Sequence, residues 1–522
     1  MDIIGFPEDL PEKFKPYFMS IYNENIRLKE RVNSLLRITL SHRSERYDIP
    51  NPLHPEGSLF NEPEKVIQES EESKDNSEKK EEPKNKSSSN KKPGRKPISP
   101  NLPRETRIHD LSENEKICKN DLTPLVQIGE EVVEKIDIVP AKVKVIEHRY
   151  LKYACPCCQQ NLVRAKTEPS LIPGSMAESG LLAHIATNKY YFALPLYRQE
   201  SLFKQNGIEI PRVTLARWMI SIGEAILPLV KEIKKYILSH NVVHCDETHV
   251  QVLKEEAKKA TSKSYMWVLA SGMSAQFPAT VFQYYSNRKQ ESAEDFIENY
   301  QGYLQVDGYG GYNSLANRPG ITRVGCWSHV RRKFESAFKD GAARGKAVAE
   351  LFLKEIQKLF LLEREFVSFS SEERLRARKE KSTPIINSIR KLIDENVTQV
   401  MPRCKLGIAF GYICEEWTNL NQFLSNGSIN LSNNRIENAI RPFAIGRNNW
   451  MFSYSANGAD ASAAIYSLVT TAKENNLHIE EYLNDVFSKL PLLKDQENPT
   501  YEALLPWNWG TEHPQHLVPV KK

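Results

Sequence analysis

Two aspartates lie at positions where a carboxylate is unfavourable for packing and therefore needs a chemical reason. Asp246 lies in the middle of a predicted strand, 242–252, and Asp307 ends another, 303–307. Strands are depleted in aspartate, and two carboxylates that converge at the centre of a sheet repel each other unless divalent cations neutralise them. Two Mg²⁺ ions about 3.5–4 Å apart can stabilise both the attacking and the leaving oxygen of an in-line displacement at phosphorus. Taken singly, each aspartate is better explained as a strand-end or turn residue.

A third carboxylate, Glu437, comes from a segment that starts a predicted helix, 431–442. Asn434, Glu437 and Arg441 lie at i, i+3 and i+7 and therefore share one helix face. In a metal site Glu437 would be the third ligand, while Arg441 and Arg447 would reach phosphates. The competing interpretation is a capping box, with Asn434 as the N-cap and Glu437 at the third helical position. Only the three acids together outweigh these local explanations.

The elements that must position these acids follow in the order three strands, helix, strand, short connection, strand, helix. The predicted strands are 242–252, 265–270, 280–285, 303–307 and 323–327, and the predicted helices are 292–300 and a basic segment from Ser328. This is the element order of the ribonuclease-H-like fold, in which helices flank a mixed sheet. We therefore predict an α/β protein with a ribonuclease-H-like core.

The composition excludes several classes of protein. With 522 residues the chain has room for about three or four domains, and 71 basic against 66 acidic residues leave a net charge of only +5. No apolar run approaches the roughly 20 residues that span a bilayer, and the N-terminus lacks the basic and apolar regions of a secretory signal. Eight cysteines are too few for a disulfide scaffold. These features predict a cytoplasmic protein without a membrane partner.

The first hundred residues predict a helix followed by a disordered linker. Residues 20–40 carry apolar side chains at spacings of three and four, which indicates either a short coiled coil or a helix packed on its own protein. The linker is polarised, since 62–82 holds nine acids and four lysines whereas 83–97 holds six bases and no acid. Its basic end, Pro93-Gly94-Arg95-Lys96-Pro97, resembles a minor-groove hook, although a solvated linker explains it better.

Two smaller modules precede the predicted core. Short β-like runs between residues 110 and 167 are preceded by Cys118 and followed by Cys155 and Cys158. Three helices are then predicted, at 177–187, 196–205 and 214–226. The last two flank a turn and resemble a helix-turn-helix with Arg212 and Arg217 facing outward, although two packed helices are common in proteins.

Four segments carry a resemblance to a known family, and they occur in the family's order. They are 244–252, 304–313, 325–334 and 431–477. These blocks resemble the insertion sequence 66 transposase family of bacterial DDE transposases, and the resemblance covers most of the chain from about Leu102 to Trp509. It implies that Asp246, Asp307 and Glu437 are the catalytic triad and hold two Mg²⁺ ions, for which Mn²⁺ can substitute. The long spacing between Asp307 and Glu437 implies a helical insertion.

The resemblance also extends to a zipper-like segment at 20–40 and to a zinc-finger-like module. The sequence departs from the family at the first cysteine pair of that module, which reads Cys118-Lys119-Asn120-Asp121. Three thiolates, from Cys118, Cys155 and Cys158, could bind Zn²⁺ together with Asp121 or His109, and a metal-free module is an equal alternative. A second departure is Asn448, which stands where the family usually has a lysine and removes one phosphate contact.

The activity that the resemblance implies is DNA transposition. Cleavage at the end of the element frees a 3′-hydroxyl, which then attacks a target phosphodiester. The implied partners are double-stranded DNA (the terminal inverted repeats and the target), further copies of the chain on that DNA, and small accessory proteins of the element. The residues expected to contact DNA are Arg95, Lys96, Arg212, Arg217, Arg331, Arg332, Arg435, Arg441 and Arg447. The alternatives are a catalytically silent DNA-binding protein derived from a transposase, and a ribonuclease-H-like nuclease without strand transfer.

The predicted domain organisation combines these segments. In chain order it comprises a zipper-like helical segment (1–48), a charged linker (49–100), the zinc-finger-like β module (101–167), the helix-turn-helix-like region (168–238), the first part of the core (239–335), the helical insertion (336–425), the Glu437-bearing part of the core (426–476) and a family-specific tail (477–522).

Overall fold

The computed structural model describes residues 143–154, 162–256, 258–316, 318–340, 343–494, 496 and 499–519. All of them belong to one compact unit, Val139–Lys522. The predicted N-terminal helix, the charged linker with Arg95 and Lys96, and the cysteines Cys118, Cys155 and Cys158 lie outside the described residues.

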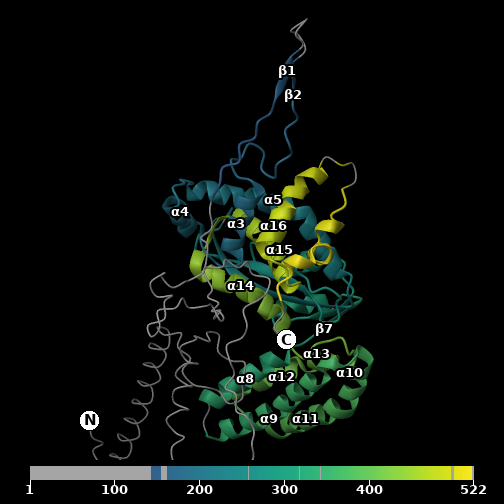
Figure 1. Cartoon of the computed structure of the whole chain (residues 1–522). Coiled ribbons are helices and arrows are strands. Elements are labelled where there is room, and N and C mark those ends of the chain that lie inside the picture. Colours follow the sequence, from purple (N-terminus) through teal and green to yellow (C-terminus); the bar gives the residue numbers. More distant parts are fainter. Residues whose placement is uncertain are drawn as a thin grey trace, which may run out of the picture. The chain divides into compact units, whose positions relative to one another are not determined.

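A six-stranded mixed sheet forms the core of the described chain (Figure 1). Its strands are β3 (Val242–Lys254), β4 (Lys263–Ser271), β5 (Thr280–Tyr285), β6 (Gly302–Gln305), β7 (Ile321–Val324) and β8 (Ser453–Ser455). They lie in the order β5-β4-β3-β6-β7, and β8 pairs with the end of β3. The first three are antiparallel neighbours, whereas β3, β6 and β7 run parallel. The prediction of an α/β core with a mixed sheet is therefore confirmed.

Helices cover this sheet. They are α5 (Arg212–Leu238), α6 (Gln290–Ile297), α14 (Asn434–Trp450) and α15 (Ala456–Glu474). Strand side chains alternate between the two faces, so Asp246 and its neighbour Glu247 point in opposite directions. Thr248 shares the Asp246 face and accepts a hydrogen bond from Arg447 of α14 at 3.0 Å, whereas Glu247 accepts one from Tyr312 on the other side. The sheet therefore presents Asp246 to α14.

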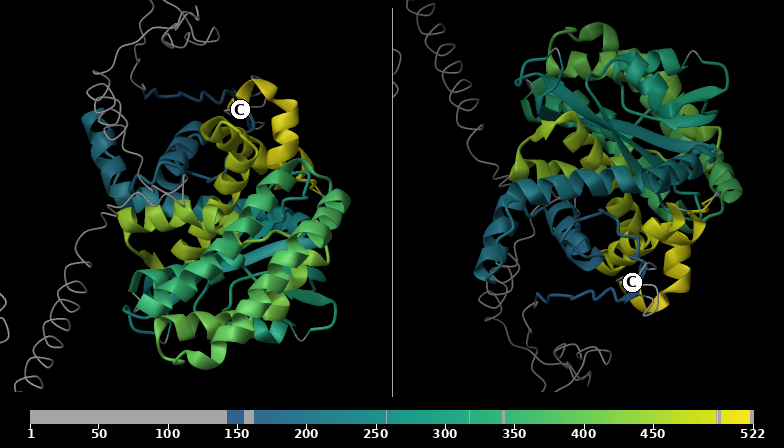
Figure 2. Two further views of the ribbon diagram at one scale, coloured as in Figure 1. Left: turned by 90° about the horizontal axis from the view of Figure 1, so that it is seen from below. Right: turned by 90° about the horizontal axis from the view of Figure 1, so that it is seen from above.

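Helix α5 runs along the sheet, packed against β4, β5 and α15 (Figure 2). By length and composition alone it could cross a membrane, but half of its apolar window is buried inside the protein, as in the core helix of a globular protein. The prediction ended this helix at residue 226, before Pro228. The helix continues because Leu229, Ile233 and Ile237 extend the buried apolar stripe beyond the proline.

The chain between β7 and α14 is helical and forms a second buried apolar cluster. Its elements are α8 (Trp327–Asp340), α9 (Ala343–Glu365), η4 (Phe366–Ser368), α10 (Ser371–Ala377), the π-helix η5 (Arg378–Ser382), α11 (Thr383–Asn396), η6 (Val397–Gln399), α12 (Lys405–Glu415), α13 (Trp417–Leu420) and η7 (Asn421–Leu424). Figure 1 shows them gathered in a bundle next to β7. Val242 and Val324 of the sheet belong to the same cluster and join the bundle to the core.

The remaining described elements lie at the two ends of this unit and in the short connection between β6 and β7. They are β1 (Lys152–Ala154), β2 (Leu162–Arg164), α3 (Ser179–Tyr190), α4 (Leu196–Gln205), η3 (Gly310–Tyr312), α7 (Asn313–Ala316), α16 (Ile479–Lys494), η8 (Glu502–Leu504), α17 (Pro506–Glu512) and η9 (Pro514–His516).

Two strands of the sheet, β6 and β7, end earlier than predicted. β6 ends at Gln305, two residues before Asp307. β7 ends at Val324, so Trp327 is the first residue of α8 and not the last of the strand, and its backbone N–H donates to Leu431 O.

Candidate active site

Asp246 and Asp307 are neighbours across the sheet. β3 and β6 run parallel with His244 opposite Gln305. Asp246 lies two residues further along β3, and Asp307 lies two residues past the end of β6, close enough for its charge to raise the pKa of Asp246. Asp246 shares a strand face with His244, whose ring contacts Asn430. The structure thus brings the two predicted aspartates together.

Neither aspartate forms an ion pair in the part of the chain that the structure describes, although the charge of Asp246 acts on Arg332 and that of Asp307 acts on Arg288 at longer range. Asp246 Oδ1 accepts a hydrogen bond from the backbone N–H of Glu247 at 2.8 Å, and Asp307 Oδ1 accepts one from Tyr309 N–H at 2.9 Å. Burial raises the pKa of Asp246 well above its ordinary value, and the negative charges of Glu247, Asp307 and Glu437 raise it further. Burial and the neighbouring negative charges thus act on Asp246 without a direct ion pair to offset them.

The helix that carries Glu437 is docked on β3 by a buried polar network. α14 begins at Asn434, so its N-cap is Asn433, which makes no side-chain capping bond. The alternative of a capping box with Asn434 as the N-cap is therefore wrong. Instead Asn433 Oδ1 lies 2.7 Å from His244 Nδ1, and its amide nitrogen donates to Cys245 O at 3.3 Å. Asn430 lies 3.2 Å from the other ring nitrogen of His244. Burial lowers the pKa of His244 to about 4, which fits a neutral ring that donates from Nδ1 and accepts at Nε2.

Glu437 is held by a cation of α8, Arg332. Both oxygens of its carboxylate accept from Arg332, whose side chain is half exposed, and His329 Nε2 lies 3.9 Å away. Burial lowers the pKa of His329, and its Nδ1 is buried without a hydrogen-bond partner. The third predicted acid therefore lies close enough to the aspartates to affect the pKa of Asp246, but it is engaged elsewhere.

The donor set fits a divalent cation chemically. Carboxylate oxygens are the ligands that Mg²⁺ prefers, and two adjacent acids without a cation of their own are what such an ion neutralises. Within the described ranges, however, no three His, Cys, Asp or Glu side chains converge closely enough to hold a metal ion. The carboxylate of Glu437 is paired with Arg332.

The predicted DNA-contacting arginines of the core fall into two groups. Arg212, Arg217 and Arg441 are exposed. The others contact acids or backbone of the protein itself: Arg331 bonds Glu335, Arg332 bonds Glu437, Arg435 bonds Glu474 at 2.5 and 2.8 Å, and Arg447 bonds Thr248 and His249 O. Arg435 can reach a phosphate only by giving up a bidentate ion pair that is mostly buried.

Four residues around the two aspartates were missed by sequence reasoning. They are Glu247, Arg288, Tyr309 and Tyr312, which contact one another on the side of the sheet opposite Asp246. Glu247 was available as a signal, since it is a second acid in the same strand, and Tyr309 and Tyr312 lie in the glycine-rich segment after Asp307. Arg288 gives no local signal because its partner lies 41 residues away.

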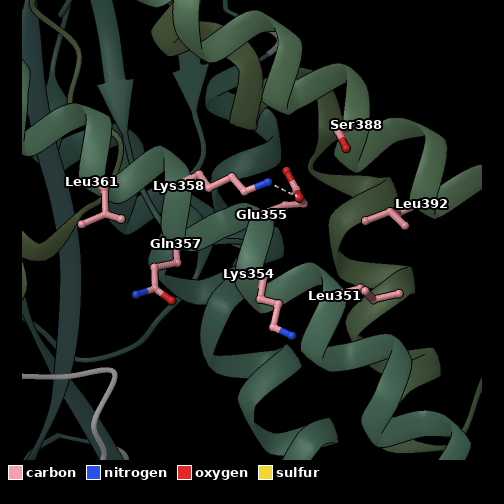
Figure 3. Close-up of a pocket in the computed structure, with 8 residues that line it drawn as sticks. All are labelled: Leu351, Lys354, Glu355, Gln357, Lys358, Leu361, Ser388 and Leu392. Carbon is pink, nitrogen blue, oxygen red and sulfur yellow. Dashed lines mark hydrogen bonds and ion pairs between the residues drawn. The ribbon is translucent and has the colours of Figure 1, made fainter.

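A pocket between α9 and α11 lies away from these acids (Figure 3). Its lining combines Leu351, Leu361 and Leu392 with polar side chains, of which Lys358 and Glu355 form an ion pair at 2.6 Å. It contains none of the predicted site residues.

Comparison with known proteins finds related sequences along the chain. A family model described as "Transposase IS66 family" matches residues 174–461, more than half of the chain. Models described as "zinc-finger binding domain of transposase IS66" and "IS66 C-terminal element" match 115–159 and 467–507. Two proteins of Sinorhizobium fredii, named uncharacterized proteins y4jD and y4qI, are 30% and 31% identical to it. The alignments cover 79% and 74% of this chain and 81% and 72% of those relatives.

Proposed function

This chain belongs to the IS66 transposase family, and on that premise we propose that it is a DDE transposase that cuts the ends of an insertion sequence and joins them to target DNA. The observation that carries the proposal is the position of Asp246 near Asp307 on neighbouring parallel segments of the sheet, two acids that form no ion pair within the described residues. Adjacent carboxylates are suited to hold the divalent cations of a metal-dependent phosphoryl transfer. The matches to the zinc-finger and C-terminal models on either side support a transposase over an isolated nuclease domain.

The topology supports a ribonuclease-H-like core. Three antiparallel strands in sequence order are followed by two parallel strands added on the other side of the first, giving β5-β4-β3-β6-β7. In this proposal the first part of the core is 239–335, the helical insertion is 336–425 and the Glu437-bearing part is 426–476. The helix-turn-helix-like region, 168–238, precedes the core.

Asp246, Asp307 and Glu437 would hold Mg²⁺, or Mn²⁺ in its place. When bound, two such ions activate the attacking oxygen and neutralise charge on the phosphate and the leaving oxygen. β3 places Asp246, Asp307 follows two residues after the end of β6, and Asn433 fixes the start of the Glu437 helix against His244. No covalent intermediate on the protein is required, so the protein contributes positioning and charge.

Arg332 links DNA binding to this site in the proposal. In the free protein its guanidinium bonds Glu437. A DNA phosphate that takes over Arg332 releases the third carboxylate to the metal site. The exposed residues Arg212, Arg217 and Arg441 are proposed to contact the DNA backbone as well, and such contacts make affinity strongly salt-dependent. We also propose that the chain binds DNA as a homo-oligomer and that its N-terminal module holds Zn²⁺. Accessory proteins of the element are proposed as further partners.

The test is strand transfer of a labelled element end into a plasmid in the presence of Mg²⁺. We expect the wild-type chain to cut and join the end, and Asp246→Asn to bind it without doing either. The matched control is Asp394→Asn, an exposed aspartate of α11 paired only with Arg390, which should retain both activities.

Two other outcomes would contradict the proposal, and each indicates a different activity for this chain. If the wild-type chain binds the ends but neither cuts nor joins them, the proposal fails and a silent DNA-binding protein is the better description. If it cuts but never joins, a nuclease without strand transfer is correct.

A further inference from the structure

Glu247 is an acid beside the candidate site whose carboxylate faces away from it. It follows Asp246 in β3, and its side chain is only 1% exposed. One carboxylate oxygen accepts from Arg288, in the loop after β5, and the other accepts from the hydroxyl of Tyr312 in η3. Both oxygens are thus engaged on the face of the sheet opposite Asp246.

The same contacts reach the segment that follows Asp307. The guanidinium carbon of Arg288 lies 3.4 Å from the ring centroid of Tyr309, and the Tyr309 hydroxyl donates to Arg288 O at 2.7 Å. Tyr309 also donates its backbone N–H to Asp307 Oδ1 at 2.9 Å. Tyr309 and Tyr312 therefore connect Asp307 to the residue next to Asp246.

We propose that these four residues, Glu247, Arg288, Tyr309 and Tyr312, form a clamp that holds the Asp307 turn against the Asp246 strand. Glu247 is then a positioning residue for the metal site and not a ligand of it. The inference rests on the proposed function, because it assigns a role relative to the two proposed metal ligands.

Two features of the chain make such a clamp necessary. β6 ends at Gln305, so Asp307 is outside the strand and is not fixed by pairing with β3. Positions 308, 310 and 311 in the following turn are all glycine, which has the largest conformational freedom to lose. The aromatic contacts of Tyr309 and the buried hydroxyl of Tyr312 restrict this turn where its own sequence does not.

The experiment measures Mn²⁺ binding to the full-length chain without DNA, by electron paramagnetic resonance. The variants are Glu247→Gln, Arg288→Met and the double variant, with Asp246→Asn as the reference for a lost ligand. Groups that orient metal ligands typically change affinity by about ten- to a hundredfold when removed. We expect each single variant to weaken Mn²⁺ binding by that factor. The double variant should weaken it by no more than either single one, because one clamp is broken in all three.

Arg288→Met leaves a buried carboxylate without its cation and can fail to fold, so Tyr312→Phe is the second route. It removes one hydroxyl, keeps the ring in the core, and should weaken Mn²⁺ binding in the same direction. Thermal unfolding of every variant separates a loss of fold from a loss of positioning.

Two results would overturn the clamp. One is an Mn²⁺ affinity that Glu247→Gln and Tyr312→Phe leave unchanged. The other is a complete loss of binding in Glu247→Gln, as in Asp246→Asn, while Tyr312→Phe binds normally, since Glu247 would then be a ligand. A wild-type chain that binds Mn²⁺ with the expected variant pattern but never cuts DNA would refute the proposed function and leave the clamp standing.

Discussion

Replacement of Arg378 by methionine tests the way the helical bundle is tied to the rest of the chain. Arg378 begins the π-helix η5 and is fully buried. Its Nε and Nη2 donate to the two carboxylate oxygens of Glu363 at 2.8 and 2.6 Å. The remaining N–H groups donate to Phe423 O, Asn426 O and Ile429 O at 2.9, 3.1 and 2.8 Å. All five donors of the guanidinium are thus used.

The expected loss follows from what the substitution leaves behind. Methionine keeps the buried volume but strands the Glu363 carboxylate, and removing one partner of a buried ion pair costs about 3–5 kcal/mol. Three carbonyl oxygens lose their donors as well, so the free energy of unfolding should fall by at least the lower end of that range. In the unit Val139–Lys522, an unfolding entropy of about 2.1 cal/mol/K per residue makes 1 kcal/mol correspond to about 1.2 °C, which predicts a melting temperature lower by about 4–6 °C.

The assay is chemical and thermal unfolding of the full chain, with Arg376→Met as the matched control. Arg376 lies two residues earlier and is exposed, so its replacement should change the stability by less than about 0.5 kcal/mol. Adding Glu363→Gln to Arg378→Met removes the stranded charge and should recover part of the loss. A stability of Arg378→Met within about 1 kcal/mol of the wild type would refute the reasoning, because that is far below the cost of breaking a buried pair.

Three further predictions concern other contacts. Asn433→Ala removes the acceptor of the buried His244 ring, so the free energy of unfolding should fall by about 1–3 kcal/mol; the exposed Asn434→Ala should change it by less than about 0.5 kcal/mol, and equal losses would speak against the network. Arg332→Met releases Glu437, so the DNA-free chain should bind Mn²⁺ more tightly; an unchanged affinity in the same resonance measurement would contradict the exchange of partners. The hydrogen bond that His184 Nδ1 donates to Glu480 raises the pKa of His184 above 6.5, so this contact between α3 and α16 stabilises the fold fully below that pH and is lost as the pH rises through the raised value. Urea titrations at pH 5.5 and 8 give the free energy of unfolding at each pH. Between these two values the wild type should lose up to about 1 kcal/mol more of this free energy than Glu480→Gln does, since both side chains are partly exposed. Identical pH profiles of the two proteins would exclude the His184 contact as the origin.

The core could be predicted from the sequence because its signals are local. Apolar runs at 242–252, 265–270 and 280–285 are long enough to indicate strands, and the structure has strands at each of them. The order of elements then allowed few topologies, since connections are short and parallel strands need a crossover. Asp246 and Asp307 could be paired because aspartate is unfavourable in and beside strands.

The environment of Glu437 could not be predicted, because the deciding contacts are distant in sequence. Asn434 and Glu437 have the spacing of a capping box, but Asn433 bonds His244, which lies 189 residues away. Arg435 looks like a free cation on a helix, yet its partner Glu474 lies 39 residues further on. A local pattern gives the type of side chain and its helix face, whereas its partner depends on how the elements pack.

The bundle between β7 and α14 also contacts the turn that carries Asp307. Arg323 of β7 donates to Asp307 O and to Glu416, at the end of α12, both at 2.9 Å. A Cβ atom at Gly308 would collide with the ring of Tyr412 in α12, so any larger residue at this position would require that ring to move. The turn after β6 is therefore shaped from one side by the bundle and from the other by the clamp.

The same bundle holds the segment that leads into the Glu437 helix. Arg378 bonds three carbonyls between residues 423 and 429, and Asn430, next along the chain, accepts from Gln305 at 2.8 Å and contacts His244. Contacts from the bundle thus reach the segments that carry Asp307 and Glu437, the two acids of the candidate site outside β3. Because a carboxylate site tolerates little displacement of its ligands, a long helical segment between Asp307 and Glu437 is better understood as the frame that sets their positions than as an appendage to the sheet.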